Sequence, residues 1–325
     1  MPHPVIPAKA GIQFLSRCVS EELDPGLRRD DEEIFWNRIF QSGIKLLSTT
    51  TRYAVFGQPI AHSLSPRIHA SFGAQLGIPV DYRAIEAGAK DFADALARFT
   101  EEGGHGANIT LPLKQDAMAH CADISDRASR CRSINTLTRY DDRWHGDSTD
   151  GVGLLRDLLL HLDFDPNSKN CLLVGAGGAA RAVAFALADA QVRRLAIANR
   201  TQARADDLAR ALGAAPRVDV LSWDDLPDTA AFDLIINATA AGHSDASLDL
   251  PRNLVTTETL VYDLSYGPAA TRFVEWARAN GARASDGLGM LVEQAAESFL
   301  IWHGQRPETT PVLAEMRALT GSRGA

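Results

Sequence analysis

The stretch Cys171-Leu-Leu-Val-Gly-Ala-Gly-Gly-Ala-Ala180 joins an apolar strand to a glycine-rich turn. The turn, formed by Gly175, Ala176, Gly177, Gly178, Ala179 and Ala180, fits the pattern G-x-G-x-x-[GA]. In this pattern the first glycine allows a tight turn, the second lets the backbone approach a pyrophosphate, and the last small residue lets a helix pack on the strand. A glycine-rich turn without a ligand is the alternative. The strand before the turn and the helical pattern over 178–189 favour a dinucleotide site.

The next apolar segment, Leu195-Ala-Ile-Ala198, ends in Asn199, Arg200 and Thr201, and Arg204 follows one helical turn later. A site for NAD usually has Asp or Glu at this strand end, where the carboxylate binds the ribose 2′-hydroxyl. A guanidinium pairs instead with a 2′-phosphate and stacks on adenine. Because the first turn of a helix normally prefers acidic residues, we interpret Arg200 as a cofactor ligand and predict NADP rather than NAD.

Strand-length apolar segments alternate with helical patterns on both sides of residue 150. We expect strands at 53–56, 82–85, 106–109, 171–174, 194–198, 233–236 and 259–262, and helices at 66–76, 89–99, 178–189, 202–212 and 288–302. Such alternation is typical of βαβ units in mostly parallel sheets. The fold class predicted is therefore α/β, with two α/β domains and a cleft between them. The N-terminal substrate domain has a mostly parallel sheet, and the second is a Rossmann-type NADP domain.

Composition excludes several classes of protein. The 325 residues are 45% hydrophobic and 23% charged, as in ordinary globular proteins of two domains or one large one. With 33 Lys+Arg against 41 Asp+Glu, the net charge is −8, which argues against nucleic-acid or anionic-membrane partners. No segment approaches the ~20 continuous apolar residues of a membrane span. The four cysteines match neither a zinc motif nor a disulfide framework, so we expect free thiols in the cytoplasm and no metal site.

The first fifty residues differ from the rest. They contain several prolines and the charge run Arg28-Arg-Asp-Asp-Glu-Glu33, without sustained periodicity and without the features of a secretory signal. We expect a disordered or misassigned extension over 1–50, with synthesis beginning near Leu46 or Leu47 rather than at Met1. A short accessory helix over 32–39 is the alternative. An intact mass of the natively expressed protein that includes residues 1–45 would contradict a misassigned start.

Polar residues follow the apolar segments of the first half. In His62-Ser-Leu-Ser-Pro66, Ser65 reads as a helix N-cap with Pro66 at the first helical position, which leaves the Ser63 hydroxyl for a ligand. A lysine after a loop, such as Lys114, is normally only solvated. With Asp150 nearby it could be a protonated acid held in place. Further amide and hydroxyl groups come from Asn108, Thr110, Asn135, Thr136 and Thr149.

Nine motifs in order connect these segments over residues 52–319. They are Gly57–Pro66, Gly106–Lys114, Asn135–Leu137, Thr149–Gly151, Gly175–Arg181, Asn199–Thr201, Asn237–Thr239, Tyr262–Tyr266 and Asp286–Leu291. Together they closely resemble the shikimate dehydrogenase family. The resemblance implies reversible, NADPH-dependent reduction of 3-dehydroshikimate to shikimate, a step of chorismate and aromatic amino-acid biosynthesis.

The resemblance also implies roles for individual residues. It makes Lys114 and Asp150 the catalytic pair, in which the lysine gives a proton to the alkoxide left by hydride transfer. It assigns the substrate carboxylate to Ser63 and Ser65, with Tyr266 near that end, and the ring hydroxyls to Asn108, Thr110, Asn135, Asp150 and Gln294. Besides the glycine-rich turn, it places at the cofactor Asn199, Arg200, Thr201, Arg204, Thr239, Gly287 and Met290.

The domains implied are discontinuous in sequence. Residues 51–150 form the substrate-binding and catalytic domain, which the helices of 288–325 rejoin, and residues 151–287 form the NADP domain. Closure of the cleft would exclude water around the hydride. A homodimer is possible.

Three departures from the family pattern leave the catalytic groups intact. Asp147-Ser148-Thr149-Asp150 lacks an asparagine at Ser148, Asn237–Gly242 carries Ala240-Ala241 near the nicotinamide, and Cys131-Arg132-Ser133 precedes Asn135. The sequence is compatible with two rival functions. One is a quinate/shikimate dehydrogenase with broader substrate and cofactor use. The other is a protein that senses NADP without turnover, which would have no need for the Lys114/Asp150 pair.

Overall fold

The computed structural model describes residues 51–213, 217–239, 248 and 250–321. The expectations for residues 1–50, including the start site and the accessory helix, lie outside the described residues. The substitution at Ala240-Ala241 lies outside them as well.

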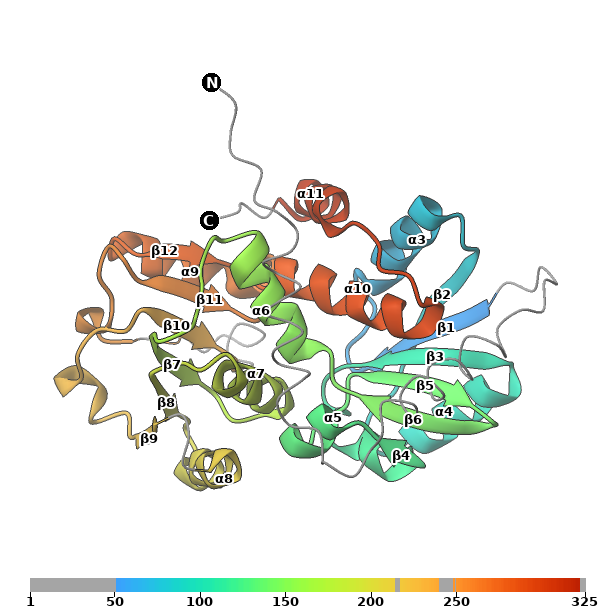
Figure 1. The fold of residues 1–325 in the computed structure, drawn as a ribbon, viewed down its shortest axis with the longest axis horizontal. Coiled ribbons are helices and arrows are strands. Elements are labelled where there is room, and N and C mark those ends of the chain that lie inside the picture. Colours follow the sequence, from blue (N-terminus) through green and yellow to red (C-terminus); the bar gives the residue numbers. More distant parts are fainter. Residues whose placement is uncertain (1–50, 214–216, 240–247, 249, 322–325) are drawn as a thin grey trace, which may run out of the picture. The chain divides into compact units, whose positions relative to one another are not determined.

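The described chain alternates strands and helices almost throughout (Figure 1). The strands are β1 (Thr51–Gly57), β2 (Val80–Glu86), β3 (Gly104–Ile109), β4 (Asp123–Ile124), β5 (Thr136–Tyr140), β6 (Arg143–Asp147), β7 (Asn170–Val174), β8 (Arg194–Ala198), β9 (Arg217–Leu221), β10 (Leu234–Asn237), β11 (Leu260–Asp263) and β12 (Arg283–Ser285). The helices are α3 (Ser65–Leu76), α4 (Phe92–Glu101), α5 (Asp126–Cys131), α6 (Asp150–Leu160), α7 (Gly178–Asp189), α8 (Gln202–Leu212), α9 (Pro268–Ala279), α10 (Leu288–His303) and α11 (Thr309–Thr320).

The first sheet has the strand order β2-β1-β3-β5-β6-β4. β1 pairs in parallel with β2 and β3, whereas β5 is antiparallel to both β3 and β6. One face packs on α4 through Phe56, Phe92 and Phe99. Next to this sheet, Phe72 of α3 and Phe299 of α10 form a second apolar cluster. This sheet therefore combines the expected parallel units with a hairpin, β5–β6, that the sequence analysis did not predict.

The second sheet has the order β12-β11-β10-β7-β8-β9, and every neighbouring pair is parallel. In β7, Cys171 and Leu173 face one apolar cluster and Leu172 and Val174 face the other, so both sides of the strand are buried. This explains the unbroken apolar run in the sequence, because a strand covered on both faces has no polar side. The order, with β7 beside both β8 and β10, is the doubly wound arrangement of dinucleotide-binding domains. The predicted α/β fold class is confirmed, while the domain boundaries at 150 and 287 stay a prediction.

Helices α6 and α10 pack closely where the chain passes between the sheets. Asp157 of α6 is fully buried and accepts a hydrogen bond of 2.5 Å from the Tyr262 hydroxyl. A Cβ on Gly289 of α10 would lie only 1.9 Å from the Asp157 Oδ1 atom. The absence of a side chain at Gly289 therefore allows the two helices to approach.

We expect Gly289→Ala to lower the free energy of unfolding by about 1–3 kcal/mol, because the added methyl group overpacks a buried site whose carboxylate is bound to the Tyr262 hydroxyl. Urea denaturation followed by circular dichroism measures this. The higher helix propensity of alanine works in the opposite direction by up to about 1 kcal/mol. An unchanged or raised free energy of unfolding would contradict this account of the helix contact.

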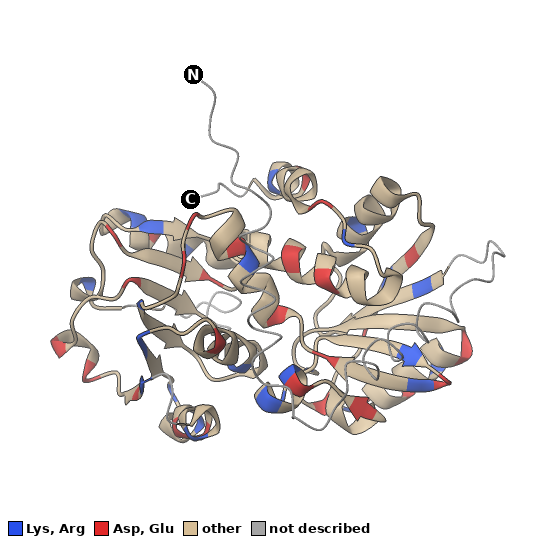
Figure 2. Cartoon of the chain, viewed as in Figure 1, with Lys and Arg blue, Asp and Glu red and all other residues tan. Residues whose placement is uncertain are grey.

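Within the described ranges, no helix is long and apolar enough to cross a membrane. Lys and Arg are interspersed with Asp and Glu over both sheets and their helices (Figure 2). No group of His, Cys, Asp or Glu in the described part of the chain is arranged to hold a metal ion. Cys121, Cys131 and Cys171 are free thiols.

Candidate active site

The glycine-rich turn leads from β7 into α7 with a geometry that requires glycine. Gly175 has φ +120°, and a Cβ there would lie 2.9 Å from the carbonyl carbon and oxygen of Ala238. A Cβ at Gly177 would meet no atom within 4 Å, so the space beside this residue is open. α7 begins at Gly178 and no side chain caps its first amides. Free amides at a helix start, with open space over Gly177, fit the pyrophosphate of a dinucleotide.

The end of β8 presents two arginines. Arg200 and Arg204 are exposed, and neither side chain makes a hydrogen bond or ion pair with another described residue. The Asn199 side chain donates to the Thr201 carbonyl oxygen at 2.8 Å and shapes the turn before α8. The first turn of α8 contains no acidic residue. Two unpaired guanidinium groups at this strand end fit a 2′-phosphate. The first turn of α8 offers no carboxylate that could bind the 2′-hydroxyl of NAD.

Lys114 and Asp150 form an ion pair, with 2.5 Å between the lysine Nζ and the aspartate Oδ2. Their side chains are 13% and 5% exposed, so the pair is largely shielded from water. Lys114 lies in the segment after β3, and Asp150 is the first residue of α6. A Cβ on Gly178 would lie 3.2 Å from the Lys114 Cβ, so the lysine lies directly beside the glycine-rich turn. The structure thus brings the predicted proton donor to the predicted cofactor site.

Asn135 links the ion pair to two other elements. Its Nδ2 donates to Asp150 Oδ1 at 2.9 Å, Thr149 Oγ1 at 2.8 Å and Gln294 Oε1 at 3.0 Å. Its Oδ1 accepts from the Thr149 backbone N–H at 2.7 Å. The residue just before β5 therefore meets the start of α6 and the middle of α10 at one amide, and the structure brings together the predicted Asn135, Asp150 and Gln294.

Asn108 lies beside this group at the end of β3 and is 5% exposed. Its Nδ2 donates to the Ser298 hydroxyl at 3.0 Å, and its Oδ1 accepts from the Tyr82 hydroxyl at 2.8 Å. Burial raises the pKa of Tyr82 well above its ordinary value, against the opposing effect of a hydrogen bond with Ser65, so the phenol stays protonated. Sequence reasoning missed both Tyr82 and Ser298. Ser298 follows Gln294 by one helical turn, and that spacing could have revealed it.

The prediction that Ser65 caps α3 is wrong. α3 already begins at Ser65, Leu64 occupies the cap position, and no side chain makes a regular cap bond. Instead, the Ser63 Oγ accepts a 3.3 Å hydrogen bond from the Ser65 backbone N–H. The Ser65 side chain is buried and lies near the Tyr82 hydroxyl of β2. The hydroxyl bound to the helix start is therefore that of Ser63, the reverse of the expected arrangement.

The remaining predicted residues lie around these groups. Tyr266 is half-buried and bonds to the backbone of Leu64, which places it at the Ser63–Ser65 turn. Thr110 follows β3 and donates its N–H to the Phe56 carbonyl oxygen. Thr239 Oγ1 donates to Asn237 Oδ1 at 2.7 Å, after β10. The other two cofactor candidates, Gly287 and Met290, lie at the start of α10. A Cβ on Gly287 would approach the Leu264 carbonyl oxygen to 2.4 Å. The Met290 N–H donates to the Tyr262 hydroxyl.

Two of the sequence departures lie within the described part of the chain. Ser148 is held through its backbone N–H, which donates to Asp147 Oδ1 at 2.7 Å. Arg132 ends α5 with φ +52°, a left-handed conformation that is uncommon for a residue other than glycine. Cys131 is buried, with its Sγ 3.4 Å from the Ser133 carbonyl oxygen. None of these residues disturbs the Lys114–Asp150 pair.

A doubly wound dinucleotide domain, a second α/β domain and a lysine–aspartate pair beside the nucleotide turn define an oxidoreductase of the two-domain, NADP-dependent class. Three family models match the chain: the shikimate dehydrogenase substrate-binding domain at residues 55–137, shikimate/quinate 5-dehydrogenase at 159–265 and the shikimate 5′-dehydrogenase C-terminal domain at 287–317. The chain belongs to the shikimate dehydrogenase family.

Individual relatives agree with the family models. A shikimate dehydrogenase (NADP(+)) of Xanthomonas euvesicatoria is 54% identical over 271 residues, which cover 82% of this chain and 96% of the relative. One from Stenotrophomonas maltophilia is 52% identical over 270 residues, with the same shares of both chains. The crystal structure of the Thermus thermophilus shikimate 5-dehydrogenase, in complex with NADP(H) and shikimate, aligns with a TM-score of 0.73 and 35% identity. It covers 83% of this chain and 99% of that one.

Proposed function

We propose that this chain catalyses the reversible reduction of 3-dehydroshikimate to shikimate with NADPH, and that Lys114 is the proton donor. One observation carries the assignment of roles: the Lys114–Asp150 ion pair is shielded from solvent and lies against Gly178 of the nucleotide turn. A protein that only senses NADP has no use for a proton donor at that position.

NADPH, when bound along the glycine-rich turn, supplies the hydride that converts the ring carbonyl of the substrate to an alkoxide. The Lys114 Nζ donates a proton to that oxygen and completes the alcohol. Its positive charge also stabilises the negative charge that develops on the oxygen during the transfer. Asp150 keeps the ammonium directed by its 2.5 Å contact, and solvent returns the proton to Lys114 after the reaction. In the direction of shikimate oxidation, neutral Lys114 accepts the proton from the hydroxyl.

The groups around Lys114 suit a hydroxylated ring that carries a carboxylate. Asn108, Asn135 and Gln294 present amides, and Asp150 accepts hydrogen bonds from hydroxyl groups adjacent to the reacting carbon. The hydroxyls of Ser63 and Ser65, next to Tyr266, bind the carboxylate. Neutral donors suffice for this purpose because hydrogen bonds to a charged acceptor are about twice as strong as neutral ones.

The direct test is the absorbance of the reduced nicotinamide after the purified protein is mixed with shikimate and NADP⁺. We expect rapid reduction of NADP⁺ with shikimate, and much slower reduction when quinate replaces shikimate or NAD⁺ replaces NADP⁺. Comparable rates with quinate and NAD⁺ would establish the broader quinate/shikimate activity. Binding of NADP⁺ without any turnover would establish the sensor.

The two serines offer a matched pair of variants. Ser63→Ala and Ser65→Ala should each raise the KM for shikimate about 10-fold with little change in kcat, because each removes one hydrogen bond to a carboxylate. Ser63→Ala should also lower the free energy of unfolding by about 0.5–1 kcal/mol, since its Oγ accepts from the start of α3. Steady-state kinetics and urea denaturation measure both effects. A fall in kcat at unchanged KM would contradict the assigned carboxylate contact.

We further propose that the enzyme acts in the cytoplasm. The three described cysteines support this because they remain thiols, as is usual in reducing compartments. Cell fractionation with an antibody to the protein tests it, and recovery from an oxidising compartment would contradict it. A homodimer stays a prediction, to be measured by light scattering coupled to size-exclusion chromatography.

A further inference from the structure

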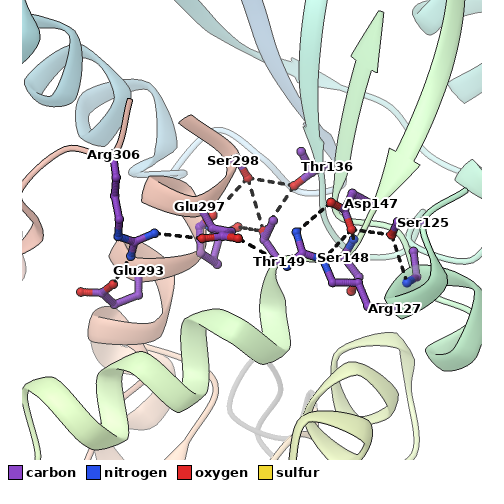
Figure 3. Close-up of polar contacts among 12 residues, drawn as sticks. Ser125, Arg127, Thr136, Asp147, Ser148, Thr149, Glu293, Glu297, Ser298 and Arg306 are labelled. Carbon is purple, nitrogen blue, oxygen red and sulfur yellow. Dashed lines mark hydrogen bonds and ion pairs between the residues drawn. The ribbon is translucent and has the colours of Figure 1, made fainter. Parts of the chain in front are cut away.

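A chain of alternating charges runs beside the candidate active site and is not used by the proposed chemistry. It links Asp147 at the end of β6 to Arg127 of α5, then to Glu297 of α10, Arg306 and Glu293 (Figure 3). The Glu293 side chain is fully buried and its second oxygen lies 2.8 Å from the His161 Nε2, just after α6. This series of charges thus joins the last residue of β6 to both helices that connect the sheets.

Arg127 makes the most specific contact in this chain. Its Nε donates to Asp147 Oδ1 at 2.6 Å and its Nη2 donates to Asp147 Oδ2 at 2.7 Å, a two-point contact that fixes both position and angle. Ser125 Oγ and the Ser148 N–H donate to the same Oδ1 at 2.5 and 2.7 Å. Burial acts to raise the pKa of Asp147, but the Arg127 hydrogen bonds and charge outweigh it and keep this pKa below its ordinary value.

Asp147 begins the short segment between β6 and α6, which leads to Asp150, the proposed catalytic aspartate. Three residues later the chain reaches Asp150, the partner of Lys114. The Asp147 carbonyl oxygen accepts from the Asn135 N–H at 3.1 Å, and the Asn135 side chain donates to Asp150. A shift of Asp147 therefore moves Asp150 through the main chain and through Asn135 together.

The other end of the charge series holds α10 in place. Arg127 Nη1 donates to Glu297 Oε1 at 3.4 Å, and Arg306 donates to Glu297 at 3.0 Å and to Glu293 at 2.6 Å. These two glutamates flank Gln294, whose Oε1 accepts from Asn135. The charges thereby set the position of α10, and so of Gln294, relative to β6.

We propose that Arg127 is a positioning residue: through its two-point contact with Asp147 and its link to Glu297, it holds Asp150, Asn135 and Gln294 in register with Lys114. This inference rests on the proposed function of the Lys114–Asp150 pair. Stability alone gives a weak reason for the arrangement, because partly exposed ion pairs contribute little to stability and apolar side chains often replace even buried ones without loss. The two-point contact of a guanidinium with a carboxylate fixes orientation as well as distance, and proton transfer depends on the orientation of the reacting groups.

The test compares Arg127→Met and Arg127→Lys with Arg194→Met. Arg194 is a matched control, since its Nε lies 2.5 Å from Asp219 Oδ2 and both side chains are 25% exposed, against 35% and 21% for Arg127 and Asp147. It lies at the start of β8, away from the site. We expect Arg127→Met to lower kcat about 10- to 100-fold, since a displacement of about 1 Å costs about that much. Its KM for NADPH should stay unchanged.

Arg127→Lys keeps the charge but not the fork, so its kcat should fall between those of Arg127→Met and the wild type. Arg194→Met should keep the wild-type kcat even where it lowers the free energy of unfolding. A kcat for Arg127→Met within about twofold of wild type, or equal losses for both methionine variants, overturns the inference. If Arg127→Met does not fold, Arg127→Lys decides: wild-type kcat overturns the positioning role. Lys114→Ala, assayed in parallel, separates this from the proposed function, because full activity there refutes the proton donor whatever Arg127 does.

Discussion

Lys114→Ala should lower kcat by about 10³-fold, within the range of 10²- to 10⁴-fold that a positioned general acid contributes. The proton moves in the transition state, so the KM for shikimate should change by only a few fold. Steady-state assays in both directions measure these constants. The loss should be similar for reduction and oxidation, because the same nitrogen donates the proton in one direction and accepts it in the other.

Two variants sharpen this result. Lys90→Ala removes an exposed lysine of the same domain and should leave kcat unchanged. Asp150→Asn keeps the shape of the partner but removes its charge, and should also lower kcat by about 10²-fold, because the ammonium loses its orienting partner. A Lys114→Ala enzyme with the turnover number of the wild type would refute the assigned chemistry even though the fold and family stand.

Arg200→Asp should reduce the preference for NADPH over NADH by about 100-fold or more. The substitution removes a charge-assisted hydrogen bond to the 2′-phosphate, worth about 1.5–3 kcal/mol, and places a repelling carboxylate there. The same carboxylate can accept a hydrogen bond from the 2′-hydroxyl of NADH. The measurement is the ratio of kcat/KM for the two cofactors at saturating substrate.

Arg210→Asp is the control for this change. Arg210 lies on α8 like Arg204, is exposed, and pairs with Asp207 rather than facing the end of β8. It alters the net charge of the domain by the same amount, so long-range electrostatics are held constant. An equal loss of NADPH preference in both variants would show that Arg200 acts only through general charge and does not contact the 2′-phosphate.

Local sequence was sufficient wherever a structure is determined by neighbours in the chain. The turn after β7 was predictable because its glycines follow a buried strand directly, and the structure shows that a side chain at Gly175 would collide with Ala238. The apolar run at 171–174 predicted a strand, and the structure adds that both faces of this strand are covered by apolar clusters.

Local reasoning was wrong where a polar side chain had a distant alternative. Ser65 has the residue type and the following proline of a helix cap, yet it already lies within α3, buried near Tyr82 of β2. Ser63 then takes the bond to the helix start. A cap rule compares only residues within one turn, so it cannot account for the packing of the helix start against β2.

The α/β class, the dinucleotide turn and the preference for NADP could be predicted from local sequence patterns, and the motifs also supplied Lys114 and Asp150 as the candidate catalytic pair. The sequence did not reveal that Asn135, Asp150 and Gln294 meet at one amide, or that Arg127 binds both Asp147 and Glu297; these contacts depend on the folded chain. The reason is physical: propensities and turns depend on residues a few positions apart. The contact between Asn135 and Gln294 joins residues 159 positions apart, and it forms only when the tertiary packing brings α10 to the start of β5.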